Sequence, residues 1–362
     1  MAMLCLVACQ NDDTDFSEYT NGSKPASKVT AISIVYNGNT ATVTGDDKGY
    51  VTVSGADVTV STSTDTDSLL LILSGTTSDG SLLVFHEKKY GIRLNGVSIA
   101  NNDGPAINNQ CGKALYLDVA DGTTNTLSDG ATYAEKTYDQ KGALFSEGQI
   151  FFLGTGKLNV TGNSKHAIAC DDYIIMNENT TLSVSCSSGN GVKVNDGIWI
   201  NNGTLDIDVS SIAGRGIKCD SVVVITGGNI TINTTGDDVY DETEADYSSA
   251  ACIKCDYDFT MSGGKLTMTS SGEGGKGLNC DGTVTVSGGT FSAVTSGGND
   301  NAKPKAVKGD GITVSGGSFY AKVDKGWACD NGSDSETPSE RVTIVGTPNP
   351  PTLTKKLVVI EF

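Results

Sequence analysis

The sequence Gly216-Ile-Lys-Cys-Asp220 decides the fold, because its pattern occurs eight times in the chain. In most copies a small residue comes first, an apolar residue follows and an acidic residue closes the pattern. The copies occupy residues 143–147, 167–171, 191–195, 216–220, 252–256, 277–281, 306–310 and 326–330. Their fourth positions are 24, 24, 25, 36, 25, 29 and 20 residues apart. A repeat of this length without helical periodicity is typical of a solenoid, in which each repeat stacks on its neighbours.

Each repeat contains three short segments with the alternation of a half-buried strand. The copy at 216–220 is followed by the apolar segment 222–225, the turn Gly227-Gly228 and the segment 230–232. Period-two alternation bounded by glycine predicts strands. The abundance of glycine, 45 residues, agrees with many tight turns. We therefore predict an all-β protein, a right-handed parallel β-helix with three-strand coils of about 24–25 residues.

Stacking of equivalent strands predicts rows of like side chains along the helix axis, about 4.8 Å apart. In the copy at 216–220, Ile217 and Cys219 should point inward, and Lys218 and Asp220 should point outward. The third position then gives a lysine row, Lys193, Lys218, Lys254 and Lys308. The fifth position gives an acidic row, Glu147, Asp171, Asp220, Asp256, Asp281, Asp310 and Asp330.

Five of the ten cysteines occupy the inward fourth position, Cys170, Cys219, Cys255, Cys280 and Cys329. Side chains stacked in register stay parallel at the strand spacing, which exceeds the Cβ separation of a disulfide. We expect these thiols to be reduced and to act as small buried apolar groups.

The chain is expected to consist of an N-terminal tether and one long domain. Residues 1–28 are interpreted as a lipoprotein signal remnant and flexible tether, because Leu6-Val-Ala-Cys9 resembles the bacterial lipobox with Cys9 as the lipidated residue. The acidic run 10–15 resembles the signal for surface export of Bacteroidetes lipoproteins. Residues 29–362 should form a single β-helix domain, with cap strands at 29–60 and a C-terminal cap segment at 340–362.

These features predict an outer-membrane lipoprotein exposed at the cell surface, attached to the membrane only through lipid at Cys9. The protein is expected to be a monomer. Its net charge of −18 argues against nucleic acid as a partner and is compatible with bound cations.

The run from about Val51 to Asp330 resembles the carbohydrate-binding β-helix family of bacterial surface proteins, which bind acidic sugars and are similar in fold to pectate lyases. The motifs that carry the resemblance are Leu94-Asn-Gly-Val-Ser-Ile99, Asn125-Thr-Leu-Ser-Asp-Gly130 and Ser287-Gly-Gly-Thr-Phe291. The resemblance implies calcium-assisted binding of a plant or microbial polysaccharide. It does not by itself imply catalysis.

The chain departs from the family at the position before each copy, where an aspartate commonly supplies a metal ligand. Here that position holds Gly142, His166, Asn190, Arg215, Ala251, Lys276, Lys305 and Lys325. Its basic members lie close to the predicted lysine row. We therefore predict a basic stripe for an acidic, pectin-like polysaccharide, made of Lys193, Arg215, Lys218, Lys254, Lys276, Lys305, Lys308 and Lys325.

Calcium has two predicted locations. Asp220 and Asp256 could bridge the ion to sugar carboxylates. The long insertion also carries Asp237, Asp238, Asp241, Glu242, Glu244 and Asp246, which are the hard oxygen ligands that calcium prefers. The alternative for this loop is a solvated acidic segment without an ion.

The two tryptophans are predicted to have different roles. Trp199, between two inward isoleucines, should face outward and contact sugar, whereas Trp327 should be an inward plug near the C-terminal end.

Two functions other than binding stay open. One is a polysaccharide lyase, with Lys218 or Lys254 as the base that removes the proton next to a uronic carboxylate. The other is a structural or adhesin-like surface protein. Neither His86 nor His166 has a partner at a spacing that would predict a catalytic triad.

Overall fold

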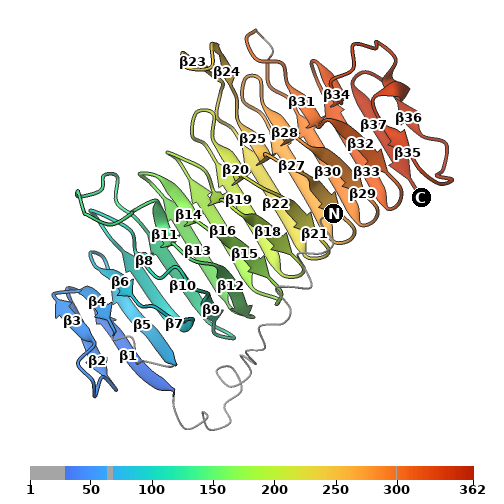
Figure 1. The fold of residues 1–362 in the computed structure, drawn as a ribbon. Helices are drawn as coiled ribbons and strands as arrows, with labels where there is room; N and C mark the ends of the chain where they lie inside the picture. The colour runs from blue at the N-terminus through green and yellow to red at the C-terminus, as the bar shows by residue number, and fades with distance from the viewer. Residues whose placement is uncertain (1–28, 63–67, 299) are drawn as a thin grey trace.

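The computed structural model describes residues 29–62, 68–298 and 300–362. These residues form a parallel β-helix of about 11 turns, and Figure 1 shows the coils stacked in chain order from the N-terminal to the C-terminal end. The predicted right-handed β-helix is confirmed. No helix in this part of the chain is long and apolar enough to cross a membrane.

Three columns of strands run along the axis, and the outer surface of each column is named the first, second or third face. The first column is a 12-stranded sheet. It consists of β3 (Val51–Ser54), β4 (Asp57–Ser61), β6 (Ser81–Phe85), β8 (Ile107–Asn109), β11 (Gly142–Ser146), β14 (His166–Cys170), β17 (Val192–Val194), β20 (Arg215–Cys219), β25 (Ala251–Cys255), β28 (Lys276–Cys280), β31 (Lys305–Lys308) and β34 (Trp327–Asp330).

The second and third columns belong to one 23-stranded sheet, because the long β7 pairs with β9 at its start and with β10 at its end. The second column holds β1 (Thr30–Asn37), β5 (Leu69–Thr77), β7 (Tyr90–Ala100), β9 (Leu115–Val119), β12 (Ile150–Gly154), β15 (Tyr173–Met176), β18 (Gly197–Ile200), β21 (Val223–Ile225), β26 (Phe259–Met261), β29 (Thr283–Val286), β32 (Gly311–Val314) and β35 (Thr343–Ile344). The third holds β10 (Thr124–Ser128), β13 (Lys157–Gly162), β16 (Thr181–Cys186), β19 (Thr204–Val209), β22 (Asn229–Thr234), β27 (Lys265–Ser270), β30 (Thr290–Thr295), β33 (Ser318–Val323) and β37 (Leu357–Glu361).

The inward positions of all three columns fill one continuous apolar core. Ile217 and Cys219 are fully buried, and Lys218 between them is only half-buried. The alternation predicted from the repeat is therefore confirmed. Lys193, Lys218 and Lys254 are partners in the strand register, so the lysine row also exists.

The Gly-Gly turns between the second and third columns require glycine for two reasons. Gly264 has φ of 75°, a conformation that side chains rarely adopt. A Cβ there would also lie 2.5 Å from the carbonyl oxygen of Gly227 on the preceding coil. Close stacking of the coils thus excludes any larger residue at this turn.

The last coil corrects the predicted alignment by two residues. Val307 pairs with Cys329 and Lys308 with Asp330, whereas the repeat predicted Gly309 opposite Cys329. Cys329 is therefore not in the column of Cys170, Cys219, Cys255 and Cys280, and Asp330 lies in the lysine row. All eight described cysteines are buried and free of disulfides, and the prediction about Cys9 lies outside the described residues.

The same offset makes the prediction for Trp327 wrong. Trp327 pairs with Lys305 and is half-buried, and its ring lies between the Arg341 guanidinium at 3.9 Å and the Lys355 ammonium at 4.5 Å. It closes the C-terminal end through cation–π contacts and is not an inward plug. Lys325 is exposed and stands outside the column predicted for it.

Antiparallel strands lie at both ends of the coil stack. At the N-terminal end, β2 (Thr40–Thr44) pairs with β1, and β3 pairs with β4. At the other end β37 pairs with β33 and with β36 (Thr352–Leu353), after a short 3-10 helix (Pro338–Glu340). These strands occupy edges that would otherwise be open to pairing with another chain.

The insertion forms a two-stranded hairpin, β23 (Val239–Asp241) and β24 (Asp246–Ser248), which projects from the coil stack in Figure 1. Its chain returns directly into β25, so its C-terminal strand lies beside the first face.

Candidate functional site

The central part of the first face is a chain of alternating ion pairs. Lys218 Nζ lies 2.8 Å from Asp220 and 2.9 Å from Asp256. Lys193 shares Asp220 at 2.5 Å, and Lys254 joins Asp256 at 2.8 Å. Lys254 also reaches Asp281 at 2.5 Å. The cations and carboxylates predicted as separate ligand-binding and metal-binding rows therefore neutralise each other.

This pairing fixes the charge states of its members. Burial alone would lower the pKa of Lys218, but its hydrogen bonds to Asp220 and Asp256 and their charges outweigh burial and raise the pKa. Burial would raise the pKa of both carboxyls, yet the lysines hold them below their usual range. Lys218 is thus held protonated, which is the opposite of what a general base requires.

A second group of cations on the first face lacks carboxylate partners. Arg215 donates to the carbonyl oxygen of Ala213 at 2.6 Å and to Ser248 Oγ at 2.8 Å. Lys276 donates to Ser249 Oγ. No ion pair joins Lys308 to any residue that the structure describes. We call Arg215, Lys276 and Lys308 the cation cluster.

Strand register and the hairpin bring the cluster together. Arg215, Ala251, Lys276 and Lys305 are successive partners across β20, β25, β28 and β31. The small Ala251 leaves space between the two longer cations. Ser248 and Ser249, which bind Arg215 and Lys276, come from the end of the hairpin. Sequence reasoning missed this contribution, because the hairpin lies outside the repeat.

Burial and mutual repulsion disfavour the charged forms of the cluster's side chains. Burial, followed by the charges of Lys305, Lys308 and Arg215, lowers the pKa of Lys276 to about 8, and Asp246 opposes this only in part. Burial also lowers the pKa of Arg215. Asp256 opposes the effect on Arg215 only in part. Buried cations without a carboxylate in ion-pair contact mark a site suited to an anion.

Lys305 differs from its neighbours because it forms an ion pair with Asp330. Arg341 binds the same carboxylate at 2.7 Å. Burial would raise the pKa of Asp330, but Lys305 and Arg341 keep it low. Lys305 therefore stabilises the C-terminal coil and is not available in the same way as Lys308.

The predicted calcium ligands do not fit an ion in this geometry. Within the described chain, the three acidic side chains whose oxygens all lie within 4.8 Å are Asp139, Glu147 and Asp171, none of them in the insertion. Lys141 already binds Asp139 at 2.7 Å and Asp171 at 2.5 Å. Ca²⁺ needs six to eight oxygens, which this group does not supply.

Three carboxylates of the insertion already accept hydrogen bonds from backbone amides, two of them from neighbouring coils. Asp237 accepts from the amide of Glu273 at 2.9 Å, and Asp238 from that of Ala302 at 2.8 Å. Asp241 accepts from Thr243 at 2.9 Å. Glu242 and Glu244 are exposed. Among the described residues, the carboxylates of the insertion therefore do not converge on a point that could hold calcium.

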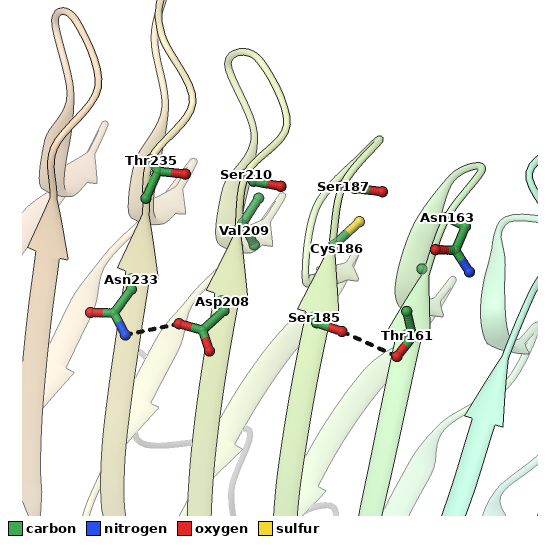
Figure 2. A pocket seen from close by; sticks show the side chains of 11 residues that line it. Thr161, Asn163, Ser185, Cys186, Ser187, Asp208, Val209, Ser210, Asn233 and Thr235 are labelled. Atoms are coloured by element: carbon green, nitrogen blue, oxygen red, sulfur yellow. Dashed lines mark hydrogen bonds between the residues drawn. The ribbon is translucent and has the colours of Figure 1, made fainter.

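The third face carries a shallow polar groove of about 230 Å³ across four coils (Figure 2). Its outward side chains already bind each other: Ser185 donates to Thr161 at 3.1 Å, and Asn233 donates to Asp208 at 2.9 Å. No lysine, arginine or aromatic residue lines it. The groove offers neither of the features expected for a charged or a stacked sugar.

Trp199 lies on the second face, half-buried between the fully inward Ile198 and Ile200. Its outward orientation agrees with the prediction. Its ring contacts that of Tyr173, with the ring centroids 5.8 Å apart, and it stands on a different face from the cation cluster.

The structure shows a parallel β-helix, and comparison with known proteins gives its class. The family model of carbohydrate-binding domain-containing proteins matches residues 54–221 and 206–302. These regions exceed half of the chain, and the protein therefore belongs to this family.

One curated protein and one solved structure are similar to the chain. A carbohydrate-binding domain-containing protein of Acetivibrio thermocellus is 31% identical over 115 residues, 30% of this chain and 40% of that protein. The chain thus matches less than half the length of this relative. The structure of a polysaccharide lyase-like protein from C. thermocellum, a gadolinium derivative, has a TM-score of 0.58 at 24% identity. The structural match covers 71% of this chain and 96% of the lyase-like protein, and it shows that the two share a fold.

Proposed function

We propose that this carbohydrate-binding protein binds an acidic polysaccharide on the first face, through the cation cluster. The observation that carries the proposal is that Arg215, Lys276 and Lys308 have only neutral partners, or none, among the described residues. A uronic carboxylate would supply the missing charge and form charge-assisted hydrogen bonds with them.

The cluster is better suited to this role than the lysine row named from the sequence. A ligand at Lys193, Lys218 or Lys254 would have to displace an existing carboxylate. A ligand at Lys276 or Lys308 displaces none. Because the whole chain has a net charge of −18, a polyanion is attracted only where cations gather without carboxylate partners, as Arg215, Lys276 and Lys308 do.

The cellular setting belongs to the same proposal. A lipid anchor at Cys9 and a place on the outer surface of the outer membrane would present the first face to extracellular polysaccharide. Palmitate labelling of the full chain and of Cys9→Ala tests this part separately.

Affinity electrophoresis in polygalacturonate tests the binding site. The double variant Lys276→Ala/Lys308→Ala should lose roughly tenfold or more in affinity, since a hydrogen bond to a charged group contributes about 1.5–3 kcal/mol. Lys265→Ala is the matched control, because Lys265 is an exposed lysine of β27 on the third face. Added salt should weaken native binding.

Equal retardation of the native protein and the double variant would refute the site. Absence of retardation by polygalacturonate at low salt would refute the acidic ligand. Ultraviolet absorbance of an unsaturated product, followed in the same samples, tests the lyase alternative. We expect binding without product.

A further inference from the structure

The second face carries a continuous row of aromatic rings across four coils. The ring centroids of Tyr116 and Phe151 are 5.1 Å apart, those of Phe151 and Tyr173 are 5.9 Å apart, and those of Tyr173 and Trp199 are 5.8 Å apart. All four side chains are half-buried. We call these residues the aromatic row.

Strand register makes the row part of the coil stack. Tyr116 pairs with Phe151, Phe151 with Ile175, and Ile175 with Trp199. Tyr173 lies two residues before Ile175 on the same face and pairs with Gly197. Val224 continues the row on the next coil. The equivalent positions beyond it are Thr260, Thr285 and Thr313, so the apolar surface is confined to one stretch of the second face.

Trp199 lies against the strand that carries it. Gly197 stands two residues before it on the same face, and a Cβ there would meet the indole ring at 2.6 and 2.7 Å. Only glycine leaves this space. The indole thus covers the backbone at Gly197 and also contacts the Tyr173 ring.

Polar side chains border the row on both sides. On one side, Asn201 donates to Asn177 at 2.7 Å and accepts from Thr226 at 2.6 Å. All three of these side chains are exposed. On the other side stand the half-buried Asp172 and the exposed Asp196. Burial, followed by the charge of Asp196, raises the pKa of Asp172.

We infer that the aromatic row is a second glycan-binding surface, which takes a neutral polysaccharide lying along the helix axis. Tyr173 stands edge-on to Phe151 and Trp199, at interplanar angles of 76° and 84°, so the rings form a stepped surface of aromatic carbon. Aromatic carbon with a few flanking amides, hydroxyls and carboxylates can hold sugar rings, whose C–H faces pack on it while their hydroxyls bind the rim. The rim contains aspartates and lacks an unpaired cation, so a polyuronate would be repelled from this face.

This inference rests on the carbohydrate-binding function but not on the cation cluster. The two surfaces lie on different columns and differ in chemistry, and their tests therefore fail separately. An aromatic row that only stabilises coil stacking is the structural alternative. It predicts a change in stability without a change in glycan binding.

Affinity electrophoresis in hydroxyethylcellulose, a neutral glucan, distinguishes a glycan-binding role of the aromatic row from a purely structural one. Trp199→Ala should lose about tenfold or more in affinity, because one ring contact and its buried area correspond to at least about 1.4 kcal/mol. Trp199→Phe should restore part of it. Thr285→Ala, at the same row position three coils further on, should bind like the native protein.

Three further measurements separate loss of binding from loss of folding and locate the binding surface. Thermal unfolding should show that each variant is folded at the assay temperature. The variant Trp327→Phe leaves Trp199 as the only tryptophan, and its emission should shift when cello-oligosaccharide is added. Lys276→Ala/Lys308→Ala should keep neutral-glucan binding.

The inference is overturned if the folded native protein is not retarded by the neutral glucan. It is also overturned if Trp199→Ala is retarded as strongly as the native protein. In that case the aromatic row has a structural role only, whatever the outcome with polygalacturonate.

Discussion

Acid should destabilise this protein through His166. The ring is neutral in the folded state, and its Nδ1 accepts a hydrogen bond from the backbone amide of Asn190 at 3.0 Å. Burial, followed by the charges of Lys193 and Lys165, lowers the pKa of His166 from 6.5 to about 4. Between these values the unfolded chain binds a proton that the folded chain does not. The free energy of unfolding should therefore fall by roughly 3 kcal/mol as pH drops from 6.5 to 4.

The repeat supplies a matched variant for this test. On the next coil Asn190 makes the same type of contact, since its Oδ1 accepts from the backbone amide of Arg215 at 3.0 Å. His166→Asn should keep the hydrogen bond and lose the titration. Urea unfolding of both proteins at pH 4 to 7 measures the difference. The lowered pKa of Asp220 affects both proteins equally and acts below pH 4. Parallel pH profiles for the two proteins would refute the reasoning.

Three other predictions follow from single contacts. Polygalacturonate binding should weaken as pH rises through about 8, where Lys276 loses its proton, and Lys276→Arg should bind equally at pH 7 and 9. In urea unfolding, Gly264→Ala should lower the free energy of unfolding more than Gly96→Ala does. Both glycines have φ of 75°, but only a Cβ at Gly264 meets backbone atoms. Equal losses of stability would contradict the close contact between coils. The unfolding temperature should be the same in calcium and in chelator, because the Asp237 and Asp238 carboxylates accept hydrogen bonds from backbone amides. A calcium-dependent rise that is lost in Asp237→Asn would instead support the calcium site predicted from the sequence.

The repeat pattern was sufficient to predict the fold, because coil stacking depends on local alternation and glycine turns. The inward orientation of Ile217 and the outward orientation of Lys218 follow directly from the period-two alternation. Because the coils stack, the equivalent residue of each copy has the same orientation. The offset at Cys329 could not be read in this way. The pattern Gly-Trp-Ala-Cys-Asp of the last copy matches the earlier copies. However, no further coil of the described chain pairs with this strand to hold it in the same register. Its Trp327 ring instead contacts Arg341 and Lys355.

The site was predicted less well than the fold, since its chemistry depends on which charges are already paired. Lys218 and Lys308 are equivalent in the repeat, yet one binds two aspartates and the other binds no described acidic residue. Tyr116 and Phe151 were not predicted as site residues, because their coils precede the regular repeat that starts at 143 or lie at its first copy, where the second segments were not aligned. Their position between buried residues of β9 and β12 was a usable signal.

The free charge of Lys308 is a consequence of the two-residue offset in the last coil. In the preceding coils an aspartate at the fifth position of the next copy binds the lysine, as Asp256 binds Lys218. The offset moves Asp330 out of the acidic row and into the register of Lys308, where Lys305 and Arg341 bind its carboxylate. Asp310, the acidic residue of Lys308's own copy, is exposed and takes part in no ion pair with the described residues. The ion-pair chain thus ends at Asp281, and Lys308 on the next coil has no ion-pair partner among the described residues. A change of register at one end of the solenoid therefore leaves part of a neutralised wall able to attract an anion.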